Sequence, residues 1–193
     1  MTPGGDAPGA PRERVAVFFD RDGTLNETRV EDGVPRPPAD LAGLQILPGV
    51  TAGLARLKTA GFLLIVVTNQ PDVARGTTPR ATVEQIHTEL ARQLPLDAVL
   101  CCYHDDPDGC ACRKPRPGMI LEAARRFGVN PERSFVVGDR WRDIAAGHAA
   151  GCTTILLQRS YSEPQRSAPH FEAPDLGAAV EIILRCVRSQ VST

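Results

Sequence analysis

Residues 18–26 read Phe-Phe-Asp-Arg-Asp-Gly-Thr-Leu-Asn, and this stretch decides how the rest of the chain is interpreted. The apolar run 15–19 predicts a short buried strand, which leads into Asp20 and Asp22 and then into a glycine turn. Alternation along the strand predicts that both acids point to one side while Arg21 points away. Two carboxylates in one small space repel each other unless a cation or a proton separates them. An isolated Asp-x-Asp is more simply explained as the polar end of a strand. A functional site is therefore indicated only if other segments of the chain supply the side chains that complete it.

Length and composition indicate an ordinary globular protein. The chain has 193 residues, 42% of them apolar, and a formal net charge of −1, which suits one domain over residues 15–190. The charge balance gives no reason to expect a nucleic-acid partner, and the longest apolar run, 62–67, is too short to span a bilayer. Residues 1–14 are rich in Gly and Pro and carry no apolar signal segment, so we expect a disordered leader and a cytoplasmic protein.

Strand and helix patterns alternate along the chain. Apolar runs bounded by glycine and proline predict strands, and apolar positions at helical spacing predict the helices between them. The expected strands are 15–19, 62–67, 96–101, 134–137 and 153–157, and the expected helices are 50–60, 77–94, 117–127, 141–150 and 175–187. This alternation predicts an α/β fold with a doubly wound parallel sheet. The gaps after the first strand and after Thr68 are too short for a separate cap domain.

Polar side chains follow four of the predicted strands. In a parallel sheet these strand ends share one edge, so the side chains should converge. They are Asp20, Asp22, Thr68, Asn69, Arg113, Lys114, Asp139 and Asp143. Carboxylates with a hard cation suit Mg²⁺, and a hydroxyl with an ammonium group suits phosphoryl oxygens.

These segments, in this order, resemble the four motifs of the haloacid dehalogenase (HAD) superfamily of phosphatases. The matching segments are Asp20-Arg21-Asp22-Gly23-Thr24, Val67-Thr68-Asn69-Gln70, Cys112-Arg113-Lys114-Pro115 and Gly138-Asp139-x3-Asp143. More narrowly, the chain is similar to the heptose bisphosphate phosphatases and to the related histidinol-phosphatase domains. Ordinary turn formers at Thr68 and Asn69 and a helix cap at Asp139 are the structural alternatives.

The resemblance implies phosphate monoester hydrolysis through an aspartyl-phosphate and assigns roles to individual residues. Asp20 is expected to be the ionised nucleophile and Asp22 the protonated general acid. Thr68 and Lys114 are expected to hold the phosphoryl oxygens. Mg²⁺ is expected on Asp20, on Asp139 and on the backbone carbonyl of Asp22. For Asp143, orienting metal-bound water or Lys114 is the expected role.

Residues 102–112 carry a second metal signature. Cys102, His104, Cys110 and Cys112 offer three thiolates and an imidazole within eleven residues, which is the ligand set of a closed structural zinc site. The alternatives are a disulfide or reactive free cysteines. A zinc ion would order this polar loop and bring Arg113 and Lys114, which follow Cys112 directly, to the phosphate.

Substrate choice follows from weaker signals. We expect Asn69, Gln70, Arg113 and Arg140 to bind substrate, because arginine forks suit a second anionic group. A small phosphorylated sugar, heptose 1,7-bisphosphate, is the expected substrate of a monomeric enzyme. Histidinol phosphate and other sugar phosphates are alternatives, since Pro71-Asp72 departs from the heptose enzymes and the zinc loop has only five residues between His104 and Cys110. A zinc-containing nucleic-acid module and a catalytically silent scaffold are the remaining alternatives.

Overall fold

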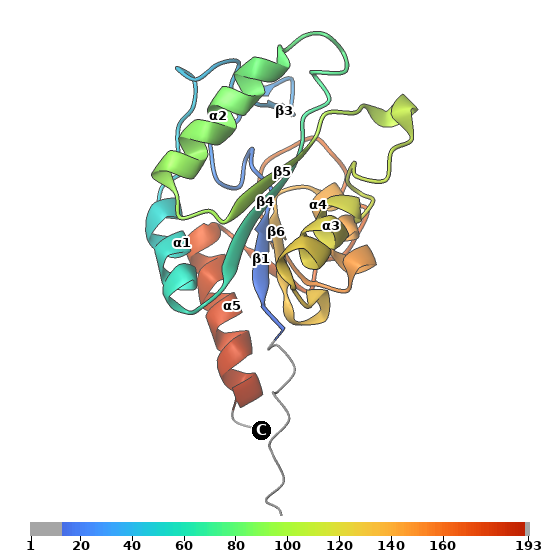
Figure 1. Cartoon of the computed structure of the whole chain (residues 1–193). Coiled ribbons are helices and arrows are strands. Elements are labelled where there is room, and N and C mark those ends of the chain that lie inside the picture. The colour runs from blue at the N-terminus through green and yellow to red at the C-terminus, as the bar shows by residue number, and fades with distance from the viewer. Residues whose placement is uncertain (1–12, 192–193) are drawn as a thin grey trace, which may run out of the picture.

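The structure, a computed structural model, describes residues 13–191 and contains one six-stranded parallel sheet with helices on both faces (Figure 1). The strand order is β5-β4-β1-β6-β7-β8. These strands are β1 (Ala16–Phe19), β4 (Leu63–Asn69), β5 (Ala98–Cys102), β6 (Phe135–Gly138), β7 (Thr153–Leu157) and β8 (Phe171–Ala173). The predicted doubly wound parallel sheet is thereby confirmed.

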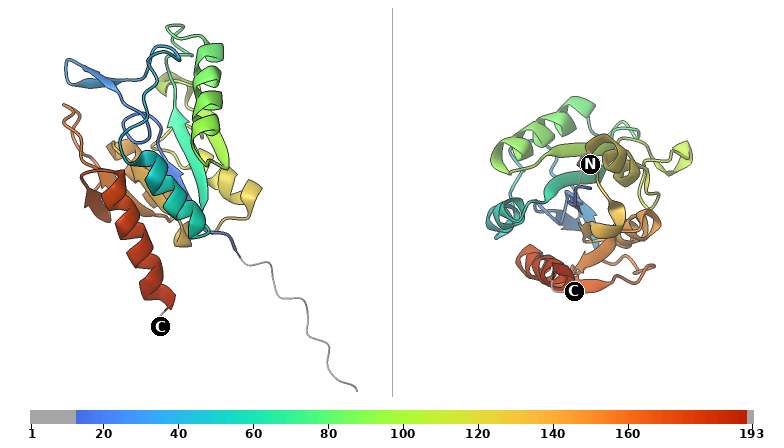
Figure 2. Two further views of the ribbon diagram at one scale, coloured as in Figure 1. Left: turned by 90° about the vertical axis from the view of Figure 1, so that its left-hand side faces the viewer. Right: turned by 60° about the horizontal axis from the view of Figure 1, so that its bottom comes forward.

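Alternation along β1 builds two cores, one on each face of the sheet. Val17 and Phe19 pack into the core beneath α1 (Val50–Thr59), α2 (Arg80–Gln93) and α5 (Leu176–Val191). Ala16 and Phe18 pack into the core beneath α3 (Gly118–Phe127) and α4 (Trp141–Ala150). All four β1 side chains are fully buried, as expected for a central strand of a parallel sheet. Figures 1 and 2 show the two helix layers on opposite sides of the strands.

Three short strands were not expected from the sequence. Strands β2 (Arg29–Glu31) and β3 (Val34–Arg36) form an antiparallel hairpin between β1 and α1, and β8 lies at the sheet edge in a segment for which no strand or helix was predicted. The hairpin projects from the end of the molecule where the parallel strands end (Figure 2). Within residues 13–191 the connection that carries it, residues 20–49, is the longest between a strand and the next helix, and it holds no separate domain, in agreement with the prediction that no cap domain is present.

The first described residues and the last helix are both tied into the fold. Residues 1–12 of the expected leader lie outside the described part of the chain, and Arg14 already pairs with Val129 through a β-bridge. The last helix starts where expected, since the Asp175 carboxylate accepts a hydrogen bond from the Ala178 amide at 2.9 Å. None of the described helices is long and apolar enough to cross a membrane.

Candidate active site

Asp20 lies at the carboxyl end of β1 and is held by an ammonium group. Lys114 Nζ donates to Asp20 Oδ1 at 2.7 Å and to Asp143 Oδ1 at 2.5 Å, and all three side chains are buried. Burial works against the charge on Lys114, but Asp143 and Asp20 outweigh it, so the pKa of Lys114 is raised. Lys114 is therefore a fixed positive charge between two acids, and the expected link between Asp143 and Lys114 is present.

Asp139 completes a cluster of three buried acids. Carboxylate oxygens of Asp20, Asp139 and Asp143 lie within 4.8 Å of one another. Burial, together with the charges of Asp20 and Asp143, raises the pKa of Asp139 well above its ordinary value. Burial likewise raises the pKa of Asp20 to about 6, against the opposing effect of Lys114. Oδ1 of Asp139 is buried and has no hydrogen-bond partner among residues 13–191. Crowded acids with an unsatisfied oxygen fit a hard divalent cation.

Two glycines leave room for this cluster. A Cβ atom at Gly138 would lie 2.3 Å from Cβ of Asp143, so a side chain there would displace that acid. Gly23 has a φ of +80°, and a Cβ atom there would lie 2.1 Å from Oδ2 of Asp139. The strand end and the turn that follows β1 therefore require glycine for close approach.

The side chains of Arg21 and Asp22 differ from the prediction. Arg21 does not point away; Nε and Nη2 donate to the Asp22 carboxylate at 3.0 and 2.9 Å. Burial would raise the pKa of Asp22, but the Arg21 charge and hydrogen bonds from Arg21, Asn26 and Gln70 lower it overall. This shift favours the carboxylate form of Asp22 in the free protein, whereas the role expected of Asp22 as a general acid needs a proton. The orientation of Arg21 has a local cause: β1 ends at Phe19, so alternation no longer governs residues 21 and 22.

His87 of α2 supports Arg21 from behind. Nη1 of Arg21 and Nε2 of His87 are 3.1 Å apart, and burial together with the Arg21 charge lowers the pKa of His87 to about 4. The neutral ring therefore accepts the hydrogen bond. No sequence motif marks His87, since it is one polar position on an amphipathic helix.

The lowered pKa of His87 makes a prediction about stability against pH. Because the folded pKa lies below the ordinary value of 6.5, this group stabilises the fold fully above about pH 6.5. The contribution is lost as the pH falls toward 4. Lowering the pH from 7 to 5 should therefore reduce the free energy of unfolding by about 1 to 2 kcal/mol, which corresponds to several degrees in Tm. His87→Gln, which keeps an acceptor for Arg21 but does not titrate, should lose less Tm over this range by calorimetry. Equal losses in both proteins would contradict the assignment.

The segment after β4 supports the acids and Lys114. The Asn69 amide donates to the Lys114 carbonyl and accepts from the Lys114 amide, both at 3.0 Å. Gln70 Nε2 donates to Asp22 at 2.8 Å and to the Thr68 hydroxyl at 2.9 Å. Asn69 and Gln70, predicted to bind substrate, thus have their amides engaged within the protein, although both also line the cavity described below. Thr68 is buried next to Gln70.

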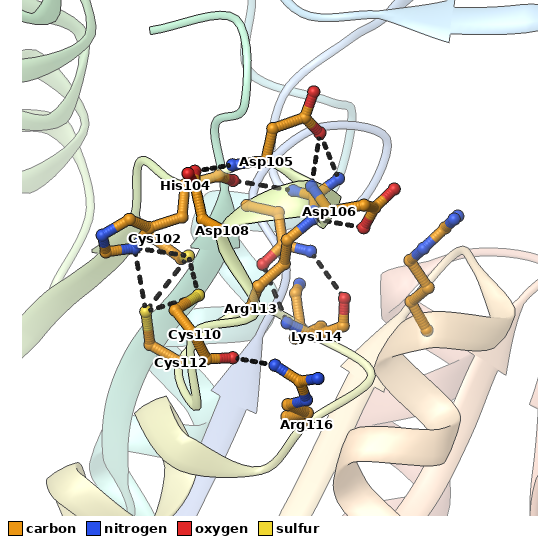
Figure 3. A network of polar contacts seen from close by, with 12 residues as sticks. Cys102, His104, Asp105, Asp106, Asp108, Cys110, Cys112, Arg113, Lys114 and Arg116 are labelled. Atoms are coloured by element: carbon orange, nitrogen blue, oxygen red, sulfur yellow. Dashed lines mark hydrogen bonds and ion pairs between the residues drawn. The ribbon is translucent and has the colours of Figure 1, made fainter. Parts of the chain in front are cut away.

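The predicted zinc ligands converge on one point (Figure 3). The three Sγ atoms of Cys102, Cys110 and Cys112 are 3.2 to 3.6 Å apart, and His104 Nδ1 lies 3.6 Å from Cys102 and 3.4 Å from Cys112. A tetrahedral zinc ion with Zn–S bonds of about 2.3 Å would place sulfur atoms about 3.8 Å apart. The thiols are free, and their sulfur atoms lie about 0.2 to 0.6 Å closer together than in such a zinc site, so the four donors already form a metal-type cluster.

Arginines connect this loop to the rest of the site. Arg113 donates to Asp106 at 2.7 Å and to the His104 carbonyl at 3.2 Å (Figure 3). Arg75, from the segment after β4, donates from Nε and Nη2 to the two carboxylate oxygens of Asp105, at 2.6 and 2.8 Å. The zinc-type loop, residues 102–112, is therefore tied both to the segment after β4 and to the residue that precedes Lys114.

A cavity of about 280 Å³ opens above Asp20 and Asp22. Its walls come from the β2–β3 hairpin, the segment after β4, the zinc-type loop and the start of α4. The positively charged lining residues are Arg36, Arg75, Arg113, Lys114, Arg140 and Arg142. Arg29 and Arg116 do not line it. The hairpin residues 34–37 that close one side were missed from the sequence.

Residues 159–163, which we call the strap, also contribute unexpected partners. Glu163 accepts hydrogen bonds from Arg140 Nε and Arg142 Nη1, each at 2.5 Å, and from Trp141 Nε1 at 2.8 Å. The Tyr161 hydroxyl donates to Asp139 Oδ2 at 2.7 Å. The strap lies in a segment for which the sequence predicted neither a strand nor a helix, and no spacing in the sequence relates it to the site.

The chain is similar in sequence to a known family of hydrolases and to individual bacterial phosphatases. A family model for HAD-hydrolase-like proteins matches residues 111–179. D-glycero-beta-D-manno-heptose-1,7-bisphosphate 7-phosphatase of Bordetella bronchiseptica is 38% identical over 147 residues, covering 74% of this chain and 79% of the relative. The enzyme of the same name from Escherichia coli K12 is 37% identical over 159 residues, covering 75% and 79%.

Solved structures agree with these relatives. D,D-heptose 1,7-bisphosphate phosphatase from B. bronchiseptica, complexed with magnesium and phosphate, has a TM-score of 0.75 and 33% identity over 89% of this chain and 98% of that chain. A HAD-like phosphatase from Mesorhizobium loti has a TM-score of 0.69 and 30% identity over 92% and 91%. The chain therefore belongs to the HAD-like hydrolases, in the family of the heptose-1,7-bisphosphate 7-phosphatases.

Proposed function

We propose that this protein is a Mg²⁺-dependent phosphatase that removes the 7-phosphate from D-glycero-D-manno-heptose 1,7-bisphosphate. The observation that carries the proposal is Lys114 held between Asp20 and Asp143 at the base of an arginine-lined cavity, beside an Asp139 oxygen that has no hydrogen-bond partner in the described part of the chain. The relatives named for this reaction match most of the chain.

The reaction uses two carboxylates in sequence. An oxygen of Asp20 attacks phosphorus and forms an aspartyl-phosphate, while the sugar oxygen leaves and takes a proton from Asp22. Water then attacks the same phosphorus, Asp22 takes the proton back, and phosphate departs as the Asp20 carboxylate is restored. Lys114 offsets the negative charge that develops on the phosphoryl oxygens, with the Thr68 hydroxyl as a further donor.

Asp22 needs a proton for the first step, although Arg21 and Gln70 stabilise its charged form in the free protein. A phosphate dianion placed beside Asp22 opposes that charge and raises its pKa, because like charges disfavour ionisation. The proton on Asp22 is thus acquired as substrate binds. Arg21 and His87 keep the carboxylate oriented during both steps.

Two metals fit the residues present. Mg²⁺ would be held by Asp20, by Asp139 and, as in the resembled family, by the backbone carbonyl of Asp22, with Asp143 beside them. When bound it supplies Lewis-acid stabilisation of the phosphoryl charge. Zn²⁺ would be held by Cys102, His104, Cys110 and Cys112 and would order the loop that presents Arg113 and Lys114.

The arginines at the cavity wall are suited to bind the second phosphate of the substrate. Arg113 is only 8% exposed and is fixed by Asp106, and Arg140 and Arg142 are paired with Glu163 at the cavity wall. Forked guanidinium groups held in place by carboxylates remain able to donate to a phosphate with their other N–H groups. A sugar carrying phosphates at both ends can place one on Asp20 and the other on this wall.

The competing substrate is histidinol phosphate, which the short zinc-type loop favours. Purified protein with Mg²⁺ should hydrolyse heptose 1,7-bisphosphate with a kcat/KM at least about tenfold higher than histidinol phosphate, since histidinol phosphate lacks a second anion worth about 1.4 kcal/mol or more to Arg113 and Arg140. Phosphate release should disappear when Mg²⁺ is omitted. A higher kcat/KM for histidinol phosphate would overturn the substrate assignment.

A further inference from the structure

The strap, residues 159–163, crosses the strand ends and contacts both the turn after β1 and the hairpin. Arg159 Nε donates to the Gly23 carbonyl at 3.0 Å, and the Ser162 amide donates to the Gly33 carbonyl at 3.0 Å. Between these two anchors stands Tyr161, whose hydroxyl donates to Asp139 Oδ2 at 2.7 Å. The strap thus delivers one hydroxyl group to one carboxylate of the acid cluster.

The two oxygens of Asp139 have different surroundings. Oδ2 accepts the Tyr161 hydroxyl, whereas Oδ1 is buried without a partner among residues 13–191 and belongs to a side chain that clusters with Asp20 and Asp143. A Cβ atom on Gly23 would lie 2.1 Å from Oδ2 and 2.5 Å from the Tyr161 hydroxyl, so there is no space for the carboxylate to move toward that turn. The arrangement fixes the rotation of the Asp139 carboxylate.

We propose that Tyr161 is a positioning residue for the metal site: it engages Oδ2 of Asp139 so that Oδ1 stays directed at the cation. This inference rests on the Mg²⁺ requirement of the proposed function. The single hydroxyl proton of Tyr161 is committed to Asp139, so the Thr28 hydroxyl, 3.3 Å away, is the donor to the Tyr161 oxygen. Contacts that orient a metal-binding carboxylate commonly change metal affinity by about 10- to 100-fold.

The expected effect is on affinity for Mg²⁺ and not on the chemical step. Tyr161→Phe keeps the ring, which lines a cavity of about 190 Å³ behind Asp139, and removes only the hydroxyl. The Kd for Mg²⁺ should rise about tenfold, at the lower end of that range because water can enter this cavity and replace part of the bond. At saturating Mg²⁺ the kcat should stay within about threefold of wild type, since the reacting groups are untouched.

The test is calorimetric titration of Mg²⁺ into the zinc-loaded, substrate-free protein. The matched control is Tyr103→Phe at the only other tyrosine of the sequence, whose ring lies beneath Arg80. The inference predicts a weaker Kd for Tyr161→Phe alone and a parallel shift in the Mg²⁺ concentration that gives half-maximal activity.

An unchanged Kd in Tyr161→Phe, an equal loss in Tyr103→Phe, or no binding of Mg²⁺ by the wild type would overturn it. A loss of kcat at saturating Mg²⁺ with an unchanged Kd would also overturn it, because Tyr161 would then act on the reaction itself. Calorimetry needs no substrate, so a protein that binds Mg²⁺ as predicted yet releases no phosphate would refute the proposed function alone.

Discussion

Asp20→Asn is expected to reduce kcat on heptose 1,7-bisphosphate by at least about 1,000-fold. An amide oxygen is a poor nucleophile toward phosphorus, and loss of a covalent catalyst removes several orders of magnitude in rate. Lys114 Nζ can still donate to the amide oxygen at the position of Oδ1, and Asp143 still accepts from Lys114, so the fold should remain intact. The measurement is steady-state phosphate release with saturating Mg²⁺.

The matched control for this variant is Asp40→Asn. Asp40 is exposed, lies outside the cavity, and uses one carboxylate oxygen to accept from the Gly43 amide, which an asparagine can reproduce. It should keep full activity. Asp20→Asn with more than about one per cent of wild-type activity, in a preparation free of wild-type enzyme, would rule out Asp20 as the nucleophile.

Cys110→Ser is the second variant with a large expected effect. It should bind less than one tenth of the zinc bound by wild type and lower kcat/KM by about 100-fold, the usual size of losing a fixed electrostatic contact in an active site. The reason is that residues 102–112 carry little buried apolar surface apart from Cys102, while Lys114 follows the last ligand by two residues. Elemental analysis of the purified protein and steady-state kinetics measure the two effects.

Cys101→Ser provides the control for the zinc-type loop. Cys101 precedes Cys102 in β5, and its thiol lies outside the four-atom cluster. This variant should keep one equivalent of zinc and wild-type kinetics. Full zinc content in Cys110→Ser would contradict the ligand assignment, and full activity without zinc would show that the loop does not position Lys114.

The main elements were predictable because each combines an apolar run with a clear boundary residue. Strand β4 has seven residues, six of them buried, and α1 is followed by Gly61 with a φ of +90°. The hairpin was not predictable in this way. Its strands have three residues each, are largely exposed, and include Pro35, so no periodicity distinguishes them from a loop. Strand β8 was missed for the same reason.

In the candidate site, too, some features were predictable from the sequence and others were not. Asp20, Lys114 and Asp139 converge as predicted, because parallel strands bring their carboxyl ends to one edge. The zinc-type cluster was predictable from ligand spacing alone. Tyr161 and Glu163 come from an irregular segment whose path depends on tertiary contacts. The orientation of Arg21 was wrong because a strand rule was applied beyond the strand.

The activity proposed for Asp20 and its neighbours is hydrolysis of one particular phosphate ester. It is tested most directly by following the wild-type protein with Mg²⁺ and heptose 1,7-bisphosphate by phosphorus NMR. We expect one equivalent of inorganic phosphate and a product that retains its 1-phosphate. Release of the 1-phosphate, or no turnover of this sugar by a protein that hydrolyses histidinol phosphate, would contradict it.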